Sequence, residues 1–180
     1  MNTKLCPLAG TIIGGRPYTD NYGVKAIAYV PGLTSVLVRG ISDRPGSGAA
    51  VESLFGKNDV SIDFLADGTD KRAHIVNSNH SQFGQLLHDL YKDHCVETSG
   101  ELVRVALVGD GMDLATRLNG GLHATEIMTD TLRDERIRTL YRTAFKGDTT
   151  HSVFVDKQDG HKLVKALAKN LGIVKDVCKL

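Results

Sequence analysis

A weak internal repeat is the feature that most constrains how this chain can fold. Residues 36–38 (VLV) match residues 105–107 (VAL) 69 positions later, and residues 74–76 (HIV) match residues 151–153 (HSV) 77 positions later. The apolar positions of a helical pattern that follows the second segment recur at the same offset of 77. Such self-similarity indicates two copies of one structural unit. Each copy then has the size of a small domain that can fold independently.

Hydrophobic periodicity predicts the same order of elements in both copies: strand, helix, strand, strand, helix. Helices follow apolar stripes at i, i+3 and i+4, and strands follow short alternating or β-branched runs. Between them, clusters of Gly, Pro and Asp predict turns and loops. The expected strands are residues 24–29, 35–39, 60–66, 73–77, 102–108, 137–145 and 152–155. The first expected helix follows the change of pattern at Ser47, and the others contain the apolar stripes that begin at Phe83, Ala124 and Leu163. The expected turns and loops are Pro31-Gly32, 40–46, Asp67-Gly68 and 109–121.

This order of elements builds an antiparallel sheet with two helices on one face, the ferredoxin-like arrangement. The expected fold class is therefore α+β, with two βαββαβ domains. One sheet edge and one sheet face stay uncovered in each unit. Because an open edge invites pairing with another chain, we expect a homodimer.

Composition disfavours several classes of function. The chain has 22 Lys and Arg against 21 Asp and Glu, so its net charge of +1 gives no electrostatic footprint for nucleic acid. A ferredoxin-like RNA-binding module would need Phe64, Tyr141 and Phe145 as stacking platforms, which is few. No segment approaches the length of a membrane span, and residues 1–10 lack the apolar core of a signal peptide. We expect a cytoplasmic protein.

Neither a metal site, a cofactor nor a disulfide framework is predicted. The three cysteines are far apart and form no CxxC pair, which favours free thiols at Cys6, Cys95 and Cys178. Potential metal ligands gather near the end of one predicted helix, but two histidines six residues apart fit metal ligation poorly. We expect a solvated helix end at these residues, which are His88, Asp89, Asp93, His94 and Cys95.

The sharpest local signal joins a predicted strand to a predicted helix at residues 40–50 (GISDRPGSGAA). Small residues keep the first helical turn open, so its unpaired N–H groups could hold a carboxylate. Asp43 beside them could accept an ammonium group, and an amino acid carries both groups a few bonds apart. A plain turn around Pro45 and Gly46 is the alternative interpretation, and the local sequence alone favours it.

The same segment carries a resemblance to a known family. Residues 38–46 (VRGISDRPG), followed by residues 60–64 (VSIDF), resemble the first ACT domain of aspartate kinases, where a strand, G-(I/V)-(S/P)-D-x-P-G, a short helix and N-I-D-M occur in this order. Further matches, also in the family's order, are residues 10–13 (GTII), 24–28 (VKAIA), 108–112 (VGDGM), 152–156 (SVFVD) and 164–167 (VKAL). The resemblance covers nearly the whole chain.

The resemblance implies a non-catalytic pair of ACT domains that binds lysine, threonine or both at a dimer interface, for allosteric feedback inhibition of an aspartate kinase. The family's phosphate-binding kinase domain, which is longer than this chain, has no match here, so a catalytic subunit is an expected partner. The implied organisation is a linker remnant (1–23), a strand that joins the second ACT domain (24–33), and ACT domains over 34–97 and 98–180. A stand-alone ACT sensor for another enzyme, or one that has lost its ligand, is the alternative.

The resemblance also implies the residues that contact the effector, and no catalytic residue among them. In the first domain these are Asp43, Arg44, Pro45, Gly46, Ser47, Gly48, Ala49, Ala50 and Asp63. The sequence departs from the family at three places. Asp67-Gly68 stands where the family has Gln-Asn, residues 117–121 (RLNGG) replace R-S-H-P-G after an apparent insertion at 113–116, and Gly147-Asp148 replaces Ser-Glu. Asp67 and Asp148 thus become candidate second acids, and the extra charge of Asp67 favours a cationic effector such as lysine.

Overall fold

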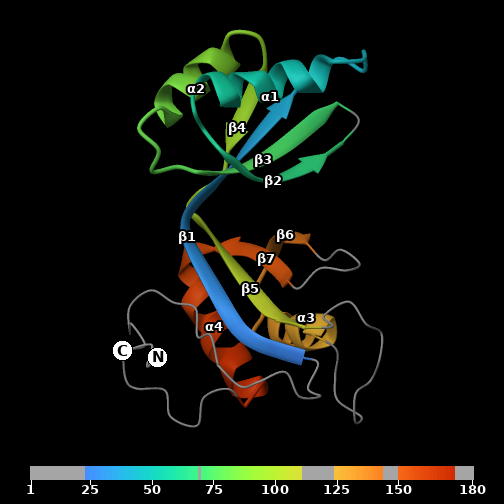
Figure 1. Cartoon of the computed structure of the whole chain (residues 1–180), viewed down its shortest axis with the longest axis vertical. Coiled ribbons are helices and arrows are strands. Elements are labelled where there is room, and N and C mark those ends of the chain that lie inside the picture. The colour runs from blue at the N-terminus through green and yellow to red at the C-terminus, as the bar shows by residue number, and fades with distance from the viewer. Residues whose placement is uncertain (1–22, 69, 111–123, 144–149, 173–180) are drawn as a thin grey trace. The chain divides into compact units, whose positions relative to one another are not determined.

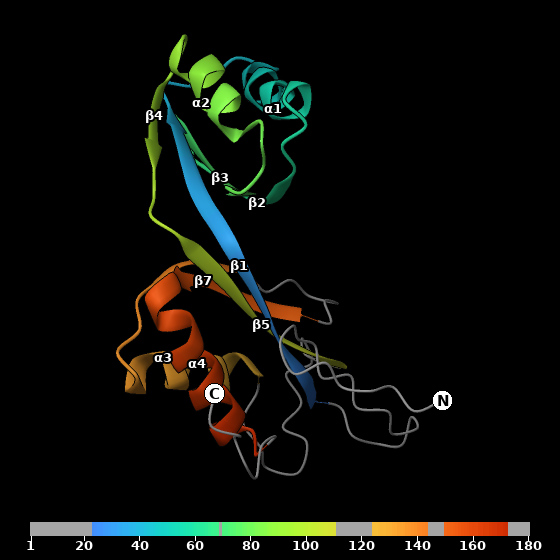
Figure 2. The same ribbon diagram turned by 90° about the vertical axis from the view of Figure 1, so that its left-hand side faces the viewer.

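The structure is a computed structural model that describes residues 23–68, 70–110, 124–143 and 150–172 (Figures 1 and 2). These residues form two compact units. The first unit comprises residues 32–102, and the second comprises residues 23–31 with the described residues from 103 onward. In chain order the elements are β1 (Gly23–Arg39), α1 (Ser47–Lys57), β2 (Ile62–Asp67), β3 (Lys71–Asn77), α2 (Phe83–Tyr91), β4 (Cys95–Thr98), β5 (Leu102–Asp110), α3 (Ala124–Asp134), β6 (Thr139–Thr143), β7 (Thr150–Asp156) and α4 (Lys157–Asn170).

The first unit is a four-stranded sheet with the strand order β2-β3-β1-β4. All three neighbouring pairs are antiparallel, and α1 and α2 cover one face (Figure 2). The alternation predicted for β2 is present, because its residues are half-buried and exposed in turn. The core between sheet and helices consists of Val36, Val38, Ile41, Val51, Phe55, Val60, Val76, Leu86, Leu90 and Val96.

The second unit has the order β1-β5-β7-β6, with the N-terminal part of β1 at the edge that β4 occupies in the first unit. Its strands β6 and β7 are antiparallel, and α3 and α4 contact each other. Val24, Ile27 and Tyr29 of β1 pack against the core of this unit. That core consists of Val103, Val105, Leu107, Ala124, Met128, Leu132, Ile137, Val153, Val155, Leu163 and Leu167.

The repeat in the sequence corresponds to a repeat in structure. His74 on β3 and His151 on β7 are both buried, and both strands are third in the sheet orders β4-β1-β3-β2 and β1-β5-β7-β6. In the same way Leu86 and Leu90 of α2 and Leu163 and Leu167 of α4 are fully buried in the two cores. The predicted α+β class with two ferredoxin-like units is confirmed.

The predicted turn at Pro31-Gly32 is wrong, because β1 runs through both residues. Gly32 takes a positive φ of +76°, and its carbonyl accepts hydrogen bonds from the backbone N (3.0 Å) and the Oγ (3.2 Å) of Ser78. Beyond it, residues 33–39 pair with β3. Pairing with distant strands thus holds the chain extended where local composition favoured a reversal.

Other element limits also differ from the prediction. Strand β4 was not predicted, because only Val96 in it is buried and so it shows no periodicity. Strand β5 extends to Asp110, into the predicted loop, and β6 starts at Thr139 rather than at 137. The predicted end of the loop at 121 and the predicted end of the strand at 145 lie outside the described residues. So do residues 1–22 with Cys6, and also Asp148 and Cys178. Cys95 is a free, exposed thiol.

None of the helices in the described ranges is both long enough and apolar enough to cross a membrane.

Candidate functional site

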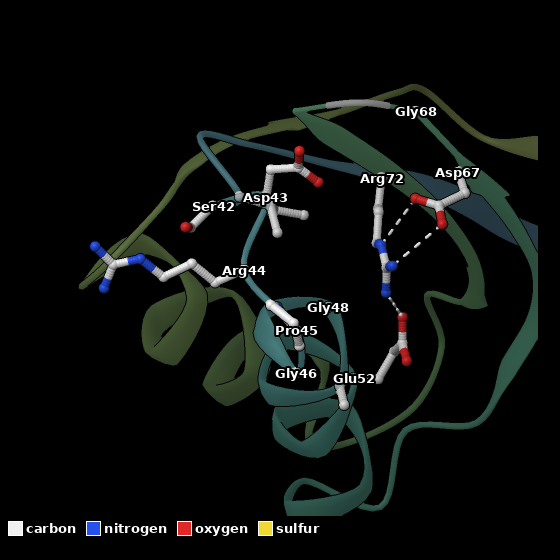
Figure 3. A pocket seen from close by; sticks show the side chains of 12 residues that line it. Ser42, Asp43, Arg44, Pro45, Gly46, Gly48, Glu52, Asp67, Gly68 and Arg72 are labelled. Carbon is white, nitrogen blue, oxygen red and sulfur yellow. Dashed lines mark hydrogen bonds and ion pairs between the residues drawn. The ribbon is translucent and has the colours of Figure 1, made fainter.

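The first unit contains a cavity of about 600 Å³ beside the start of α1 (Figure 3). Three segments surround it: the loop after β1, the first turns of α1, and the turn between β2 and β3 with the start of β3. The lining residues are Ile41, Ser42, Asp43, Arg44, Pro45, Gly46, Gly48, Ala49, Glu52, Asp67, Gly68 and Arg72. Most of the loop that the sequence marks as a candidate ligand site therefore lines this cavity.

Backbone hydrogen bonds fix the loop that borders the cavity. The N–H groups of Gly40 and Ile41 both donate to the carbonyl of Asp70, at 3.0 and 3.2 Å. Gly46 then takes a φ of +89°, a left-handed conformation that glycine adopts without strain, and its carbonyl accepts the N–H of Ala50 at 2.9 Å. The N–H groups of Gly48 and Ala49 have no hydrogen-bond partner within the described residues. The start of α1 thus offers two donors and the positive end of a helix dipole.

Arg72 crosses the cavity from β3 and holds two carboxylates. Its Nε and Nη2 donate to the two oxygens of Asp67 at 2.9 and 3.1 Å, and its Nη1 donates to Glu52 of α1. Burial lowers the pKa of Arg72, but the hydrogen bonds and charges of Glu52 and Asp67 outweigh burial and raise it. The guanidinium is thus a fixed positive charge at the start of α1.

Asp43 presents its carboxylate on the side of the loop that faces Arg72, whereas the side chain of Arg44 points away (Figure 3). Asp43 is exposed and forms no hydrogen bond or ion pair with any described residue. The cavity therefore combines one unengaged carboxylate with donors for an anion, a set that fits the ammonium and carboxylate of an amino acid.

The structure places the predicted site residues unevenly. Those that line the cavity are Asp43, Arg44, Pro45, Gly46, Gly48, Ala49 and Asp67. Ser47 and Ala50 belong to the same turn of α1 without lining it, and Asp63 lies on an exposed position of β2, also away from the cavity. Asp148 lies outside the described residues.

The sequence interpretation missed Glu52 and Arg72. Glu52 lies four positions after Gly48, on the same face of α1, and Arg72 follows Asp67 across the β2–β3 turn. Those two spacings were the available signals. The pairing with Arg72 also changes the role of Asp67, because its carboxylate is engaged within the protein. The carboxylate of Asp67 is therefore not free to bind a cationic effector, and Asp67 no longer favours lysine.

The predicted solvated helix end is wrong at Asp89. Its side chain is only 12% exposed, and its carboxylate accepts hydrogen bonds from Lys92 (2.9 Å), Gln85 (3.1 Å) and Asn58 (3.4 Å). The bonds from Lys92 and Asn58 lower the pKa of Asp89 to about 2. Across the described ranges, no three His, Cys, Asp or Glu side chains are grouped so that they could hold a metal ion.

The second unit has its own polar cluster around His151, which is 2% exposed. Arg142 Nε donates to His151 Nε2 at 2.9 Å, and Arg142 Nη2 donates to the carbonyl of Thr125 (3.0 Å) and the Oγ1 of Thr129 (2.8 Å). Because Arg142 can only donate, Nε2 is the acceptor and the imidazole is neutral. Burial, with the charge of Arg142, lowers the pKa of His151 to about 4.

The fold is similar to that of the regulatory regions of aspartate kinases. The regulatory subunit of aspartate kinase from Thermus flavus superposes with a TM-score of 0.66 at 14% identity, over 82% of this chain and 98% of that one. Clostridium acetobutylicum aspartate kinase gives 0.73 at 17% identity, over 86% of this chain and 36% of that one. E. coli aspartokinase III in complex with lysine and aspartate, in the T-state, gives 0.66 at 22% identity, over 86% and 34%.

The chain therefore has the fold of an aspartate kinase regulatory region, as the sequence motifs indicate. It spans about a third of the length of the complete kinases and nearly all of the separate regulatory subunit. No family model matches the sequence, and neither does any curated protein.

Proposed function

We propose that this chain is a non-catalytic regulatory module that binds an amino acid and thereby inhibits an aspartate kinase. The observation that carries the proposal is the cavity at the start of α1, where Asp43 and the free N–H groups of Gly48 and Ala49 match the two charged groups of an amino acid. The fold supports the regulatory role, since an aspartokinase of the same fold is described in complex with lysine. Lysine and threonine are the first candidates.

The mechanism is a population shift between two packings of a homodimer. A ligand can shift this equilibrium only by as much as its affinities for the two packings differ. We propose that the amino acid bridges two copies of the module in the cytoplasm, and that the favoured packing is transmitted to a kinase domain, either on another subunit or elsewhere in a longer chain. The limits 34–97 and 98–180 for the two ACT domains, with strand 24–33 contributed to the second, are part of this proposal.

A thermal melt with each of the twenty amino acids tests the binding step. A ligand that binds only the folded state at a hundred times its dissociation constant stabilises it by about 2.7 kcal/mol, which raises the melting temperature by roughly 5–10 °C. Asp43→Asn should abolish the rise. Asp93→Asn, which changes another exposed aspartate at the end of α2, is the matched control and should keep it. The proposal fails if no amino acid shifts the melt of the intact chain.

Light scattering tests the dimer. We expect a mass close to twice 19.5 kDa at micromolar concentration, because each unit leaves a sheet edge uncovered. A monomer both with and without the amino acid would contradict the proposed mechanism. Co-purification with a catalytic aspartate kinase subunit would separate this proposal from a sensor that regulates another enzyme.

A further inference from the structure

The guanidinium of Arg72 is held between two carboxylates from two different elements. Glu52 belongs to α1 and Asp67 ends β2, and both point at Arg72 in Figure 3. The side chain of Arg72 is 22% exposed, against 32% for Glu52 and 59% for Asp67. The cation is therefore the most enclosed member of the three.

Gly48 makes the space for this cation. A Cβ on Gly48 would overlap Nη1 and Cζ of Arg72, so the guanidinium lies directly against the backbone of α1. Any side chain at this position would force Arg72 to move. By contrast, Gly56 near the other end of the same helix has nothing within 4 Å of the equivalent point.

The position of the Arg72 guanidinium is electrostatically unfavourable with respect to the α1 dipole and favourable only with respect to the two carboxylates. A positive charge at a helix N-terminus is repelled by the helix dipole, so Glu52 and Asp67 must supply the attraction that holds it there. Without Arg72, two carboxylates would face the same part of the cavity with Asp43 nearby. Like charges at short range favour the uptake of a cation.

We propose that Arg72 is a built-in occupant of a cation subsite in this cavity, and that it excludes long cationic side chains such as those of lysine and arginine from the space between Glu52 and Asp67. The ammonium group of an incoming amino acid is left with Asp43, and the side chain of that amino acid must be short and uncharged to fit beside the guanidinium. Of the two candidates named above, threonine meets this requirement and lysine does not. The exclusion of lysine and arginine as effectors rests on the proposed function. The presence of a cation subsite between Glu52 and Asp67 does not.

Chemical rescue tests the subsite directly. Arg72→Ala leaves Glu52 and Asp67 in place and should melt about 3–6 °C below the intact chain, because two ion pairs are lost. Methylguanidinium at millimolar concentration should then raise the melting temperature of this variant by about 2–4 °C, as a ligand of the folded state does. L-arginine should act in the same direction. The intact chain should respond to neither compound.

Two controls keep the test specific. Arg39→Ala removes another arginine–carboxylate pair of the same unit, in which Arg39 Nε lies 2.9 Å from Glu97, but this pair is exposed and outside the cavity. It should show no rescue. Adding Glu52→Gln to Arg72→Ala should abolish the rescue, because one of the two carboxylates is then neutral. If Arg72→Ala does not fold, Arg72→Gln carries the same test with a side chain of similar length.

Equal responses of Arg72→Ala, Arg39→Ala and the intact chain to methylguanidinium would overturn the subsite. Gly48→Ala gives a further control when it is added to Arg72→Ala, because the new methyl group occupies the place of the guanidinium and should abolish the rescue, whereas adding Gly56→Ala should keep it. The effector statement has a separate outcome: a melt of the intact chain raised by lysine would contradict it. If no amino acid raises that melt while the rescue succeeds, the proposed function fails and the subsite stands.

Discussion

Each of the two units has a buried histidine on the equivalent strand of its sheet, yet the residues around the two histidines differ. His74 of the first unit stacks on Phe55 with ring centroids 4.4 Å apart, and neither ring nitrogen forms a hydrogen bond to another described residue. His151 of the second unit accepts a hydrogen bond from Arg142. The repeated frame thus fixes where the side chain is buried, while neighbours from other strands decide its chemistry.

The arginines show the same contrast. Arg72 is held by two carboxylates, whereas the hydrogen bonds of Arg142 to described residues go to an imidazole, a carbonyl and a hydroxyl. The first unit therefore pairs its arginine with anions. The arginine of the second unit donates to neutral acceptors among the described residues, which makes the stability of this unit depend on keeping His151 unprotonated.

Acidification should produce the largest effect, and it should act through His151. Its folded pKa of about 4 lies below the usual 6.5, so the unfolded chain binds the proton first as the pH falls. The stability that neutral His151 contributes is complete above pH 6.5 and is lost as the pH falls from 6.5 to 4. The loss is up to about 3 kcal/mol, at roughly 1.4 kcal/mol per pKa unit. Burial also lowers the pKa of His74, so the first unit should weaken in the same direction.

Urea unfolding of the intact chain and of His151→Gln at pH 7 and pH 4.5 measures this effect. Glutamine keeps an acceptor for Arg142 and does not titrate, so the variant should lose less stability on acidification than the intact chain. An equal loss in both proteins would show that His151 does not control the acid sensitivity of the second unit.

A methyl group added at Gly160 should have the next largest effect. This glycine is buried near the start of α4, and an added Cβ would lie 2.5 Å from Cγ2 of Val103 and 2.9 Å from Cε2 of Tyr29. Both neighbours belong to packed strands, so Gly160→Ala should cost about 1–3 kcal/mol through overpacking. Gly56→Ala, in open space on α1, should be neutral or slightly stabilising. Differential scanning calorimetry of the two variants decides the sign, and a stabilised Gly160→Ala would contradict the packing of α4 on these strands.

The smallest effect should come from the asparagines that connect the two helices of each unit. Asn58 is buried, and it donates to the carbonyl of Leu54 at 2.8 Å and to Asp89 of α2 at 3.4 Å. Asn170 is exposed and donates to Thr131 of α3 at 2.9 Å. Asn58→Ala should therefore cost about 1–2 kcal/mol and Asn170→Ala about 0.5 kcal/mol. Denaturant midpoints in the reverse order would break the comparison between the two units.

Much of the first unit could be predicted from local patterns. The stripe over 83–91 coincides with α2, and the loop over 40–46 leads into α1 at Ser47 as expected. The position of the candidate site followed from that loop, because glycines, a proline and small residues report backbone shape directly. Arg72 was missed because its position opposite Asp67 across the β2–β3 turn does not by itself reveal its second partner. Its importance comes from Glu52, which is twenty positions away in the chain and bonded to it in space.

The sequence by itself determined most of the elements, with β4 and the continuity of β1 as the exceptions, and it determined their duplication, because periodicity and turn chemistry act over a few residues. Tertiary structure alone decided that β1 serves both units through Pro31 and Gly32, that Asp67 is engaged rather than free, and that Asp89 and His151 are shielded from water. Each of these facts depends on which distant segments meet. The hydrogen bonds and charge state of a carboxylate, an imidazole or a guanidinium depend on these tertiary contacts, because its neighbours in space determine its pKa.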